Sequence, residues 1–314
     1  MPARTMTDSQ PSFAIMGSGG VGGYFGARLA QAGYRCTFIA RGAHLAALRR
    51  RGLRIDGPDE DFTIAPCTAT DRPEDIGPVD FVLFTVKLWD TESAGAACRP
   101  LLGPGATLVS LQNGVDSEPL LCELLGREQV MGGVAQISAT ISEPGRVTRL
   151  SPFASLRVGE LDGGISARGK RLAAALADAG LEVELSADIQ RALWKKFMFL
   201  TGISALTALT RQPVGRIRED PDTRALLVEV MAEVLAVATA KGIGLSEQDL
   251  SGSLRFIDTL PAAMRASMAM DLERGNRLEL DGLSGAVVRL GRELGLETPA
   301  NRFICTALKL SAAP

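Results

Sequence analysis

The chain has 314 residues, of which 46% are hydrophobic and 22% charged, and its formal net charge is −2. This length is enough for two domains that each bury a core. The near-neutral charge gives no electrostatic reason to expect a nucleic-acid partner or an anionic membrane surface, and no apolar run is as long as a membrane span.

The N-terminal segment, residues 1–11, lacks the positive start and apolar core of a secretory signal, and we expect a disordered tail. The five cysteines are scattered without a C-x-x-C pair, which favours a reducing, cytoplasmic location. The single histidine, His44, is expected to be a solvated residue at a helix start rather than a catalytic group. The sequence indicates no metal site.

The first predicted strand, Phe13–Met16, leads into a glycine-rich turn that is followed by a predicted helix over 24–32. Gly17, Gly19 and Gly22 have the G-x-G-x-x-G spacing. Bare backbone N–H groups at a helix N-terminus bind a diphosphate, because the helix dipole favours anions and no Cβ blocks the approach. The sequence therefore predicts a dinucleotide site formed by consecutive residues: Gly17, Ser18, Gly19, Gly20, Val21 and Gly22.

The second predicted strand, residues 36–40, ends next to Arg41. A ribose with a free 2′-hydroxyl calls for Asp or Glu at this place, whereas a 2′-phosphate calls for Arg. The sequence therefore predicts NADP(H) in preference to NAD(H).

Short apolar runs then alternate with helical patterns, which is typical of a mainly parallel sheet covered by helices on both faces. Further strands are predicted at 79–86, 107–111, 130–137, 154–158 and 182–185, and helices at 43–51, 118–125 and 164–179.

From residue 186 onward the pattern becomes helical. We expect a Rossmann-type, doubly wound domain over 12–186 and an all-helical domain over 187–314, with the nicotinamide at the mouth of the cleft between them. The apolar pattern at 225–240 suggests a homodimer, although a buried core needs the same pattern. Helices are predicted at 189–209, 222–241, 246–249, 253–274 and 278–294.

Two lysines stand in an otherwise apolar helical segment. Helical spacing places Lys196 on the apolar face and turns Lys195 toward Asp188 and Arg191. Because desolvation of an ammonium costs several kcal/mol, Lys196 is a candidate functional group. The alternative is that its stem lies along the apolar face and its charge reaches water.

Three further polar residues are candidates. Glu279 begins an apolar stripe on the predicted helix 278–294, although an acidic first turn also favours the helix dipole. Lys87 and Asn113 follow predicted strands, where open parallel sheets bind ligands, although strand ends need polar turn residues in any case.

Together these features resemble the ketopantoate reductase family, within the 6-phosphogluconate-dehydrogenase-like enzymes. The resemblance covers about 12–310 and rests on the glycine turn with Arg41 and on further motifs. These are Thr85-Val86-Lys87, Gln112-Asn113-Gly114, Leu193-Trp194-Lys195-Lys196, the run from Ser267 to Glu279, and residues 285–290.

The resemblance implies NADPH-dependent reduction of a 2-keto acid, with ketopantoate reduced to pantoate. It implies that Lys196 is the catalytic acid and Glu279 its companion. It also implies that Asn113 and Ser267 bind the substrate, and that Lys87 and Asn113 contact the cofactor.

The chain departs from this family at two positions. Members that reduce ketopantoate usually carry asparagines four and eight residues after the catalytic lysine, and here these positions are Leu200 and Ser204. Ser204 remains a candidate substrate ligand, whereas Leu200 cannot hydrogen-bond a substrate hydroxyl. A reductase of a more apolar 2-keto acid or another carbonyl compound, and a catalytically silent NADP(H)-binding regulator, are the alternatives.

Overall fold

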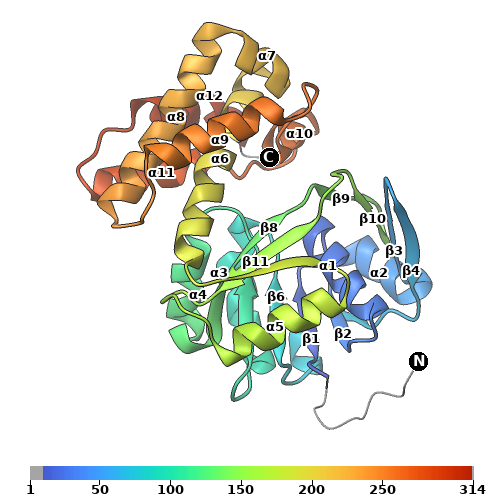
Figure 1. Cartoon of the computed structure of the whole chain (residues 1–314). Coiled ribbons are helices and arrows are strands. Elements are labelled where there is room, and N and C mark those ends of the chain that lie inside the picture. The colour runs from blue at the N-terminus through green and yellow to red at the C-terminus, as the bar shows by residue number, and fades with distance from the viewer. Residues whose placement is uncertain (1–9, 313–314) are drawn as a thin grey trace. The chain divides into compact units, whose positions relative to one another are not determined.

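The computed structural model describes residues 10–312 and divides into two compact units (Figure 1). The first unit contains the chain up to Gln112 together with Glu118–Ile189. The second contains Asn113–Ser117 together with the chain from Gln190 onward. Of the expected tail over 1–11, only Gln10 and Pro11 belong to the described residues.

The first unit is built on an eight-stranded, mainly parallel sheet, as the sequence predicts. Its strands are β1 (Phe13–Met16), β2 (Cys36–Ile39), β5 (Ala69–Thr70), β6 (Phe81–Phe84), β7 (Thr107–Ser110), β8 (Val130–Gln136), β11 (Ser155–Gly159) and β12 (Glu182–Ser186). The strand order is β12-β11-β8-β7-β6-β1-β2-β5, and neighbouring strands are parallel except β8 and β11. β1 therefore lies between β2 and β6, where the winding reverses and doubly wound sheets bind ligands.

Helices cover this sheet, which explains why every residue of β1, β6 and β7 is buried and why these strands read as continuous apolar runs. Helix α3 was not expected from the sequence. The helices of the first unit's sequence region are α1 (Gly20–Gln31), α2 (Gly42–Arg51), α3 (Thr91–Ala97), α4 (Ser117–Leu125) and α5 (Ala167–Asp178).

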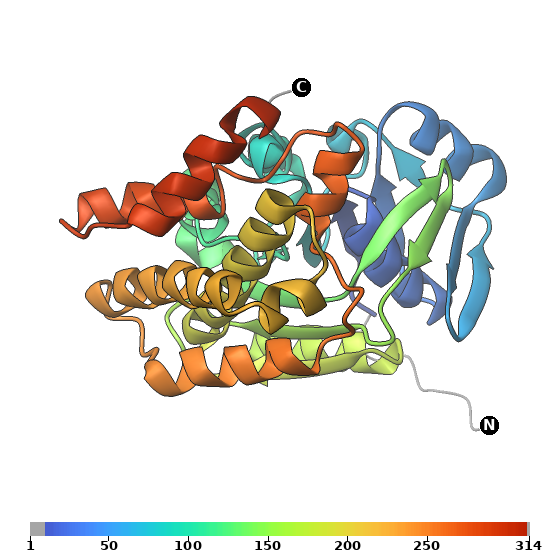
Figure 2. The same cartoon turned by 90° about the horizontal axis from the view of Figure 1, so that it is seen from above.

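A second sheet of four strands was not predicted. It consists of β3 (Leu53–Gly57), β4 (Glu60–Ile64), β9 (Ala139–Glu143) and β10 (Arg146–Arg149), in the order β4-β3-β10-β9. Figures 1 and 2 show the blue pair β3 and β4 beside the green pair β9 and β10. The sheet packs closely on α1, because a Cβ on Gly20 would lie 2.2 Å from the carbonyl oxygen of Ala139.

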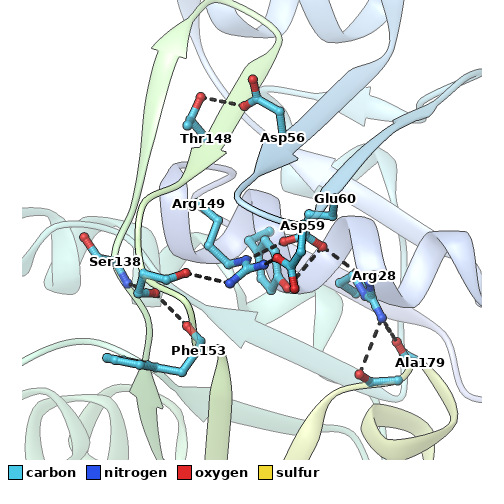
Figure 3. Close-up of polar contacts among 12 residues, drawn as sticks. Arg28, Asp56, Asp59, Glu60, Ser138, Thr148, Arg149, Phe153 and Ala179 are labelled. Carbon is cyan, nitrogen blue, oxygen red and sulfur yellow. Dashed lines mark hydrogen bonds and ion pairs between the residues drawn. The ribbon is translucent and has the colours of Figure 1, made fainter.

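A network of ion pairs around the buried Arg149 fixes this second sheet to its surroundings (Figure 3). The side chain of Arg149 is only 4% exposed and pairs with the carboxylates of Asp59 and Glu60. Glu60 also pairs with Arg28 of α1 at 3.4 Å, and Arg28 donates to the carbonyl oxygen of Ala179 at 3.2 Å. The network therefore links β4 and β10 to α1 and to the end of α5.

The second unit is helical, as expected, but its helices differ from the predicted ranges. They are α6 (Ile189–Thr210), α7 (Val214–Glu219), α8 (Pro221–Ala240), α9 (Glu247–Thr259), α10 (Ser267–Glu273), α11 (Ser284–Glu293) and α12 (Pro299–Ala312). The predictions of α6 and α8 are confirmed. The helix predicted over 253–274 is wrong, because the chain leaves α9 at Leu260 and Pro261 follows.

The C-terminal helix α12, which the sequence analysis did not predict, is capped by a side chain from α8. The carboxylate of Glu233 accepts the N–H groups of Ala300 at 2.7 Å and Asn301 at 2.9 Å. The amide of Asn301 also donates to Glu233 at 2.7 Å. Glu233 thereby satisfies N–H groups that a helix start leaves without an intrahelical partner.

The apolar side chains of α8 lie in the core of the helical unit. Val230, Met231 and Val234 are fully buried there together with Phe197 and Met198 of α6. This burial supports the core interpretation of the apolar pattern at 225–240 and removes it as an argument for a dimer. No helix among residues 10–312 is long and apolar enough to cross a membrane.

Candidate active site

The glycine turn between β1 and α1 has a conformation that requires glycine at its first position. Gly17 has φ +93°, in the left-handed region that favours glycine. A Cβ at this position would lie 2.9 Å from both the backbone nitrogen and Cγ1 of Val86. The turn therefore passes directly against the end of β6.

The other two glycines of the motif have opposite surroundings. A Cβ on Gly22 would lie 2.2 Å from Thr85 Oγ1, and Thr85 Oγ1 is itself 2.6 Å from the carbonyl oxygen of Gly17. In contrast, a Cβ on Gly19 would meet nothing within 4 Å. Gly22 thus permits close packing of α1 on the strand end, whereas Gly19 faces open space in front of the helix.

The N-terminus of α1 fits a diphosphate. Gly19 is the N-cap residue and offers no capping side chain, so the N–H groups of Gly20, Val21 and Gly22 begin the helix without intrahelical acceptors. The open space at Gly19 leaves room for phosphate oxygens to approach these donors. The residues present therefore suit the diphosphate of a dinucleotide.

The side chain of Ser18 points into the protein interior. It is 3% exposed, its N–H donates to the carbonyl oxygen of Ile39 at 3.0 Å, and its Oγ lies 3.1 Å from the same oxygen. Ser18 therefore fastens the glycine turn to the end of β2 through both its backbone and its hydroxyl.

His44 is not the solvated residue that the sequence analysis expected. Its ring lies between two backbone groups: Nε2 is 2.9 Å from the carbonyl oxygen of Ser18, and Nδ1 accepts the N–H of Gly145 at 3.0 Å. Burial lowers the pKa of His44 from 6.5, and its bond to Ser18 opposes this only in part. The expectation failed because Gly145 is far away in the sequence.

Arg41 lies at the carboxyl end of β2, as the N-cap of α2. It is exposed, and its guanidinium has no ion-pair or hydrogen-bond partner within residues 10–312. Because β1 and β2 are parallel, Arg41 and the glycine turn follow strands that end at the same edge of the sheet. Arg41 is therefore a charged group available to an anion at this edge.

Lys87 and Gln112 follow the next two strands, β6 and β7. Lys87 is exposed, and its Nζ lies 5.7 Å from the ring centroid of Trp89. The buried amide of Gln112 donates to the carbonyl oxygen of Val86 and to Thr91 Oγ1, both at 2.9 Å. Gln112 thus joins the two strand ends. The only sequence signal for this role is an amide residue placed directly after the apolar run 107–111.

In the helical unit, the structure brings together Asn113 and Glu279. Asn113 Nδ2 donates to Glu279 Oε2 at 3.3 Å, and Glu279 is 8% exposed. Glu279 does not stand in a helix, since α11 begins only at Ser284. It is held in an irregular segment between Leu278 and Leu280, whose side chains are buried on either side of it.

The two lysines of α6 differ in exposure as the helix pattern predicts. Lys195 is exposed, and its Nζ lies 3.5 Å from Asp249 Oδ1. Lys196 is half-buried. Leu200, one turn beyond Lys196, is also half-buried and packs against the core of the helical unit.

Ser204 and Ser267 have contrasting positions in the helical unit. Ser204 is 1% exposed, and its hydroxyl has no hydrogen-bond partner among the described residues. Ser267 is exposed at the first position of α10. Of the predicted substrate ligands, Ser204 thus lies within the core and Ser267 at the surface.

The chain matches two family models in succession. Residues 13–163 match the model described as "Ketopantoate reductase PanE/ApbA", and residues 188–312 match "Ketopantoate reductase PanE/ApbA C terminal".

Similar proteins agree with these matches. The 2-dehydropantoate 2-reductase of Archaeoglobus fulgidus is 32% identical over 295 residues, which cover 94% of this chain and 96% of that protein. The protein of the same name from Halobacterium salinarum is 32% identical and covers 95% and 97%. A PanE/ApbA family ketopantoate reductase from Ralstonia eutropha JMP134 has a TM-score of 0.88 and 36% identity, over 96% of this chain and 98% of that chain. The chain therefore belongs to the ketopantoate reductase family and is an oxidoreductase of the 2-dehydropantoate 2-reductase type.

Proposed function

We propose that the protein is an NADPH-dependent reductase that converts ketopantoate to pantoate. The observation that carries the proposal is the glycine turn, where Gly17 and Gly22 are packed against a strand end while Gly19 faces open space. The names of the Archaeoglobus fulgidus and Halobacterium salinarum relatives support ketopantoate as the substrate.

The choice of NADPH over NADH rests on Arg41. An exposed guanidinium without a partner in the described part of the chain suits the 2′-phosphate of NADPH, which it can bind through two parallel hydrogen bonds. Bound NADPH supplies a hydride for C2 of the keto acid. Lys87, at the end of a neighbouring strand, is a proposed second cofactor contact.

Lys196 is the proposed proton donor. As charge develops on the carbonyl oxygen during reduction, an ammonium both stabilises that charge and supplies the proton. The half-buried position of Lys196 supports this role, because the electrostatic stabilisation that a charge provides increases as water is removed.

Asn113 and Glu279 are proposed to act together. The hydrogen bond from Asn113 Nδ2 to Glu279 fixes the amide plane, so that Asn113 Oδ1 is held ready to accept a hydrogen bond. The buried carboxylate of Glu279 provides a negative charge that favours an ammonium or a substrate hydroxyl nearby. Ser267 and the unpaired hydroxyl of Ser204 are the other proposed polar contacts of the substrate.

A second candidate substrate is a 2-keto acid without a hydroxyl group. Leu200 supports it, because this half-buried aliphatic side chain lies one helical turn from Lys196 and offers no hydrogen bond. A site that hydrogen-bonds a substrate hydroxyl discriminates strongly against compounds that lack the hydroxyl. Leu200 cannot make such a hydrogen bond, so position 200 does not discriminate in this way.

The test is the rate of NADPH oxidation by the purified protein with ketopantoate, beside a panel of other 2-keto acids and with NADH as the alternative cofactor. Rapid turnover of ketopantoate with NADPH is the expected result. Turnover of only another panel member would favour the second candidate. Nucleotide binding without turnover of any compound would contradict both and favour a regulator.

We also propose a homodimer in the cytoplasm. A ketopantoate reductase from Staphylococcus aureus, at 24% identity, is described as dimeric. The five cysteines are all free, as a reducing compartment requires. Sedimentation equilibrium of the purified protein at several concentrations tests the assembly, and a monomer mass throughout would contradict it.

A further inference from the structure

The single histidine joins three parts of the first unit. His44 is on the first turn of α2, and its ring binds the carbonyl oxygen of Ser18 in the glycine turn and the N–H of Gly145 between β9 and β10. Gly145 is itself close to α2, since a Cβ there would lie 2.9 Å from Cβ of Ala47. The ring is therefore held between two backbone segments that are distant in the sequence.

These two contacts determine which ring nitrogen carries the proton. A backbone N–H can only donate, so Nδ1 of His44 accepts from Gly145 and is unprotonated. The proton of the neutral ring is then on Nε2, which donates to the carbonyl oxygen of Ser18. Burial lowers the pKa of His44 and so favours this neutral form.

The bond to Ser18 also orients the next N–H group. In a trans peptide the C=O and the following N–H point in opposite directions. When His44 holds the carbonyl oxygen of Ser18, the N–H of Gly19 is therefore directed away from the ring. This N–H has no acceptor within residues 10–312, and Gly19 faces the open space at the start of α1.

We propose that His44 is a positioning residue of the nucleotide site: it holds the Ser18–Gly19 peptide so that the N–H of Gly19 is presented to the diphosphate. The inference rests on the proposed dinucleotide function of the glycine turn. The hydrogen bond at the carbonyl oxygen also polarises the peptide and strengthens its N–H as a donor. The other side of the turn is fixed independently, by the bond from the Ser18 N–H to Ile39.

Two substitutions separate this role from a purely structural one. The amide nitrogen of Gln reaches about as far from the backbone as Nε2 of His, so His44→Gln keeps a donor for Ser18. The amide of Asn is at the distance of Nδ1, so His44→Asn keeps an acceptor for Gly145 but does not reach Ser18. Arg50→Ala, an exposed change on the same helix, is the control.

The measurement is the dissociation constant of NADP⁺ and of NAD⁺ for each variant by calorimetry, with the melting temperature as a check on folding. We expect His44→Asn to weaken both nucleotides about five- to tenfold, because the diphosphate is common to them. We expect His44→Gln to remain within about twofold of the wild type. If the substitution acted through Arg41 instead, the loss of affinity would be confined to NADP⁺, because only NADP⁺ carries the 2′-phosphate.

The outcomes are distinct. Wild-type affinity in both His44→Asn and His44→Gln would overturn the positioning role while leaving the nucleotide site intact. A loss confined to NADP⁺ would also overturn it, since His44 would then act through Arg41 and α2. If the wild-type protein bound neither nucleotide, the proposed function would fail and this inference would fail with it.

Discussion

Lys195 and Lys196 are adjacent in α6, yet only Lys196 is half-buried. We expect Lys196→Ala to lower kcat about 10²- to 10⁴-fold, the usual contribution of a general acid, with little change in NADP⁺ affinity. Steady-state kinetics measure kcat, and calorimetry measures the affinity for NADP⁺. Lys195→Ala is the matched control, because Lys195 is exposed and near Asp249. Equal losses in the two variants would contradict the assignment of Lys196 as proton donor.

At the cofactor end, Arg41 is the residue that distinguishes the nucleotides. We expect Arg41→Ala to raise the KM for NADPH about ten- to a hundredfold, because a charged hydrogen bond to the 2′-phosphate is lost, and to leave NADH almost unchanged. Kinetics with both cofactors measure the selectivity, and Arg50→Ala on the same helix is the control. An equal loss for NADPH and NADH would refute the 2′-phosphate assignment.

Leu200 gives a prediction about substrate choice. Leu200→Asn introduces an amide one turn after Lys196, at a half-buried position. We expect this change to raise kcat/KM for ketopantoate about tenfold relative to the analogue that lacks only the terminal hydroxyl. Competition between the two compounds measures the ratio. An unchanged ratio would mean that position 200 does not face the substrate hydroxyl.

For single residues, the sequence predicted the placement of those that directly follow a strand or that share a helix face. The glycine turn, Arg41 and the difference between Lys195 and Lys196 depend on local spacing, and their placement agrees with it. His44 could not be interpreted in the same way, because its partner Gly145 comes from a distant hairpin. Glu279 was placed in a helix because helical spacing put it at the head of the apolar stripe that Leu283, Ala286 and Val287 begin, whereas α11 starts only at Ser284.

Among the elements, α12 depends on one carboxylate from α8. Glu233→Ala leaves the N–H groups of Ala300 and Asn301 without their acceptor, so we expect the free energy of unfolding to fall by about 1–2 kcal/mol. Urea denaturation measures the change. Glu229→Ala, an exposed position one turn earlier in α8, is the control and should be nearly neutral. Equal stability of the two variants would contradict the capping role.

Elements were predictable where their residues are uniformly apolar or regularly amphipathic. The strands β1, β6 and β7 of the parallel sheet are almost uniformly apolar, because helices bury both faces of the sheet. The strands β3 and β10 carry Arg54, Asp56 and Arg146, so the second sheet left no apolar run to detect. The break between α9 and α10 had a local signal in Pro261, which the predicted helix over 253–274 ran through. What the sequence could not show is that the carbonyl oxygens of Ala262 and Met264 accept N–H groups from the start of α7.

For the molecule as a whole, acid should reduce the stability of both units. In the first unit, the hydrogen bond from Arg146 holds the pKa of Asp56 below its usual 3.8. In the second, burial acts to raise the pKa of Asp249, but the Ser246 N–H and the charge of Arg191 outweigh it and lower that pKa. The folded protein therefore binds these protons less readily than the unfolded chain does.

Carboxyl groups with a lowered pKa make the folded protein more stable at neutral pH than in acid. The contribution of such a carboxylate is complete above the ordinary pKa of 3.8 and is lost as the pH falls through the lower, folded value. We expect the free energy of unfolding of the wild type to decrease between about pH 5 and about pH 2, and that of Asp249→Asn to decrease less. Urea denaturation across this range measures both, with Asp222→Asn as an exposed control. Parallel curves for Asp249→Asn and wild type would contradict the prediction.

The short segment Asn113–Ser117 has a consequence for how the protein is made. It belongs to the helical unit, although residues 118–189 of the other unit follow it in the chain. During translation this segment leaves the ribosome before α6 to α12 have been synthesised. The hydrogen bond between Asn113 and Glu279 therefore cannot form until nearly the whole chain has been made. A nascent chain that stops at residue 189 can contain every strand of the parallel sheet and still lack the Asn113–Glu279 pair. The hydrogen bond between Asn113 and Glu279 is therefore among the last contacts that the growing polypeptide can form.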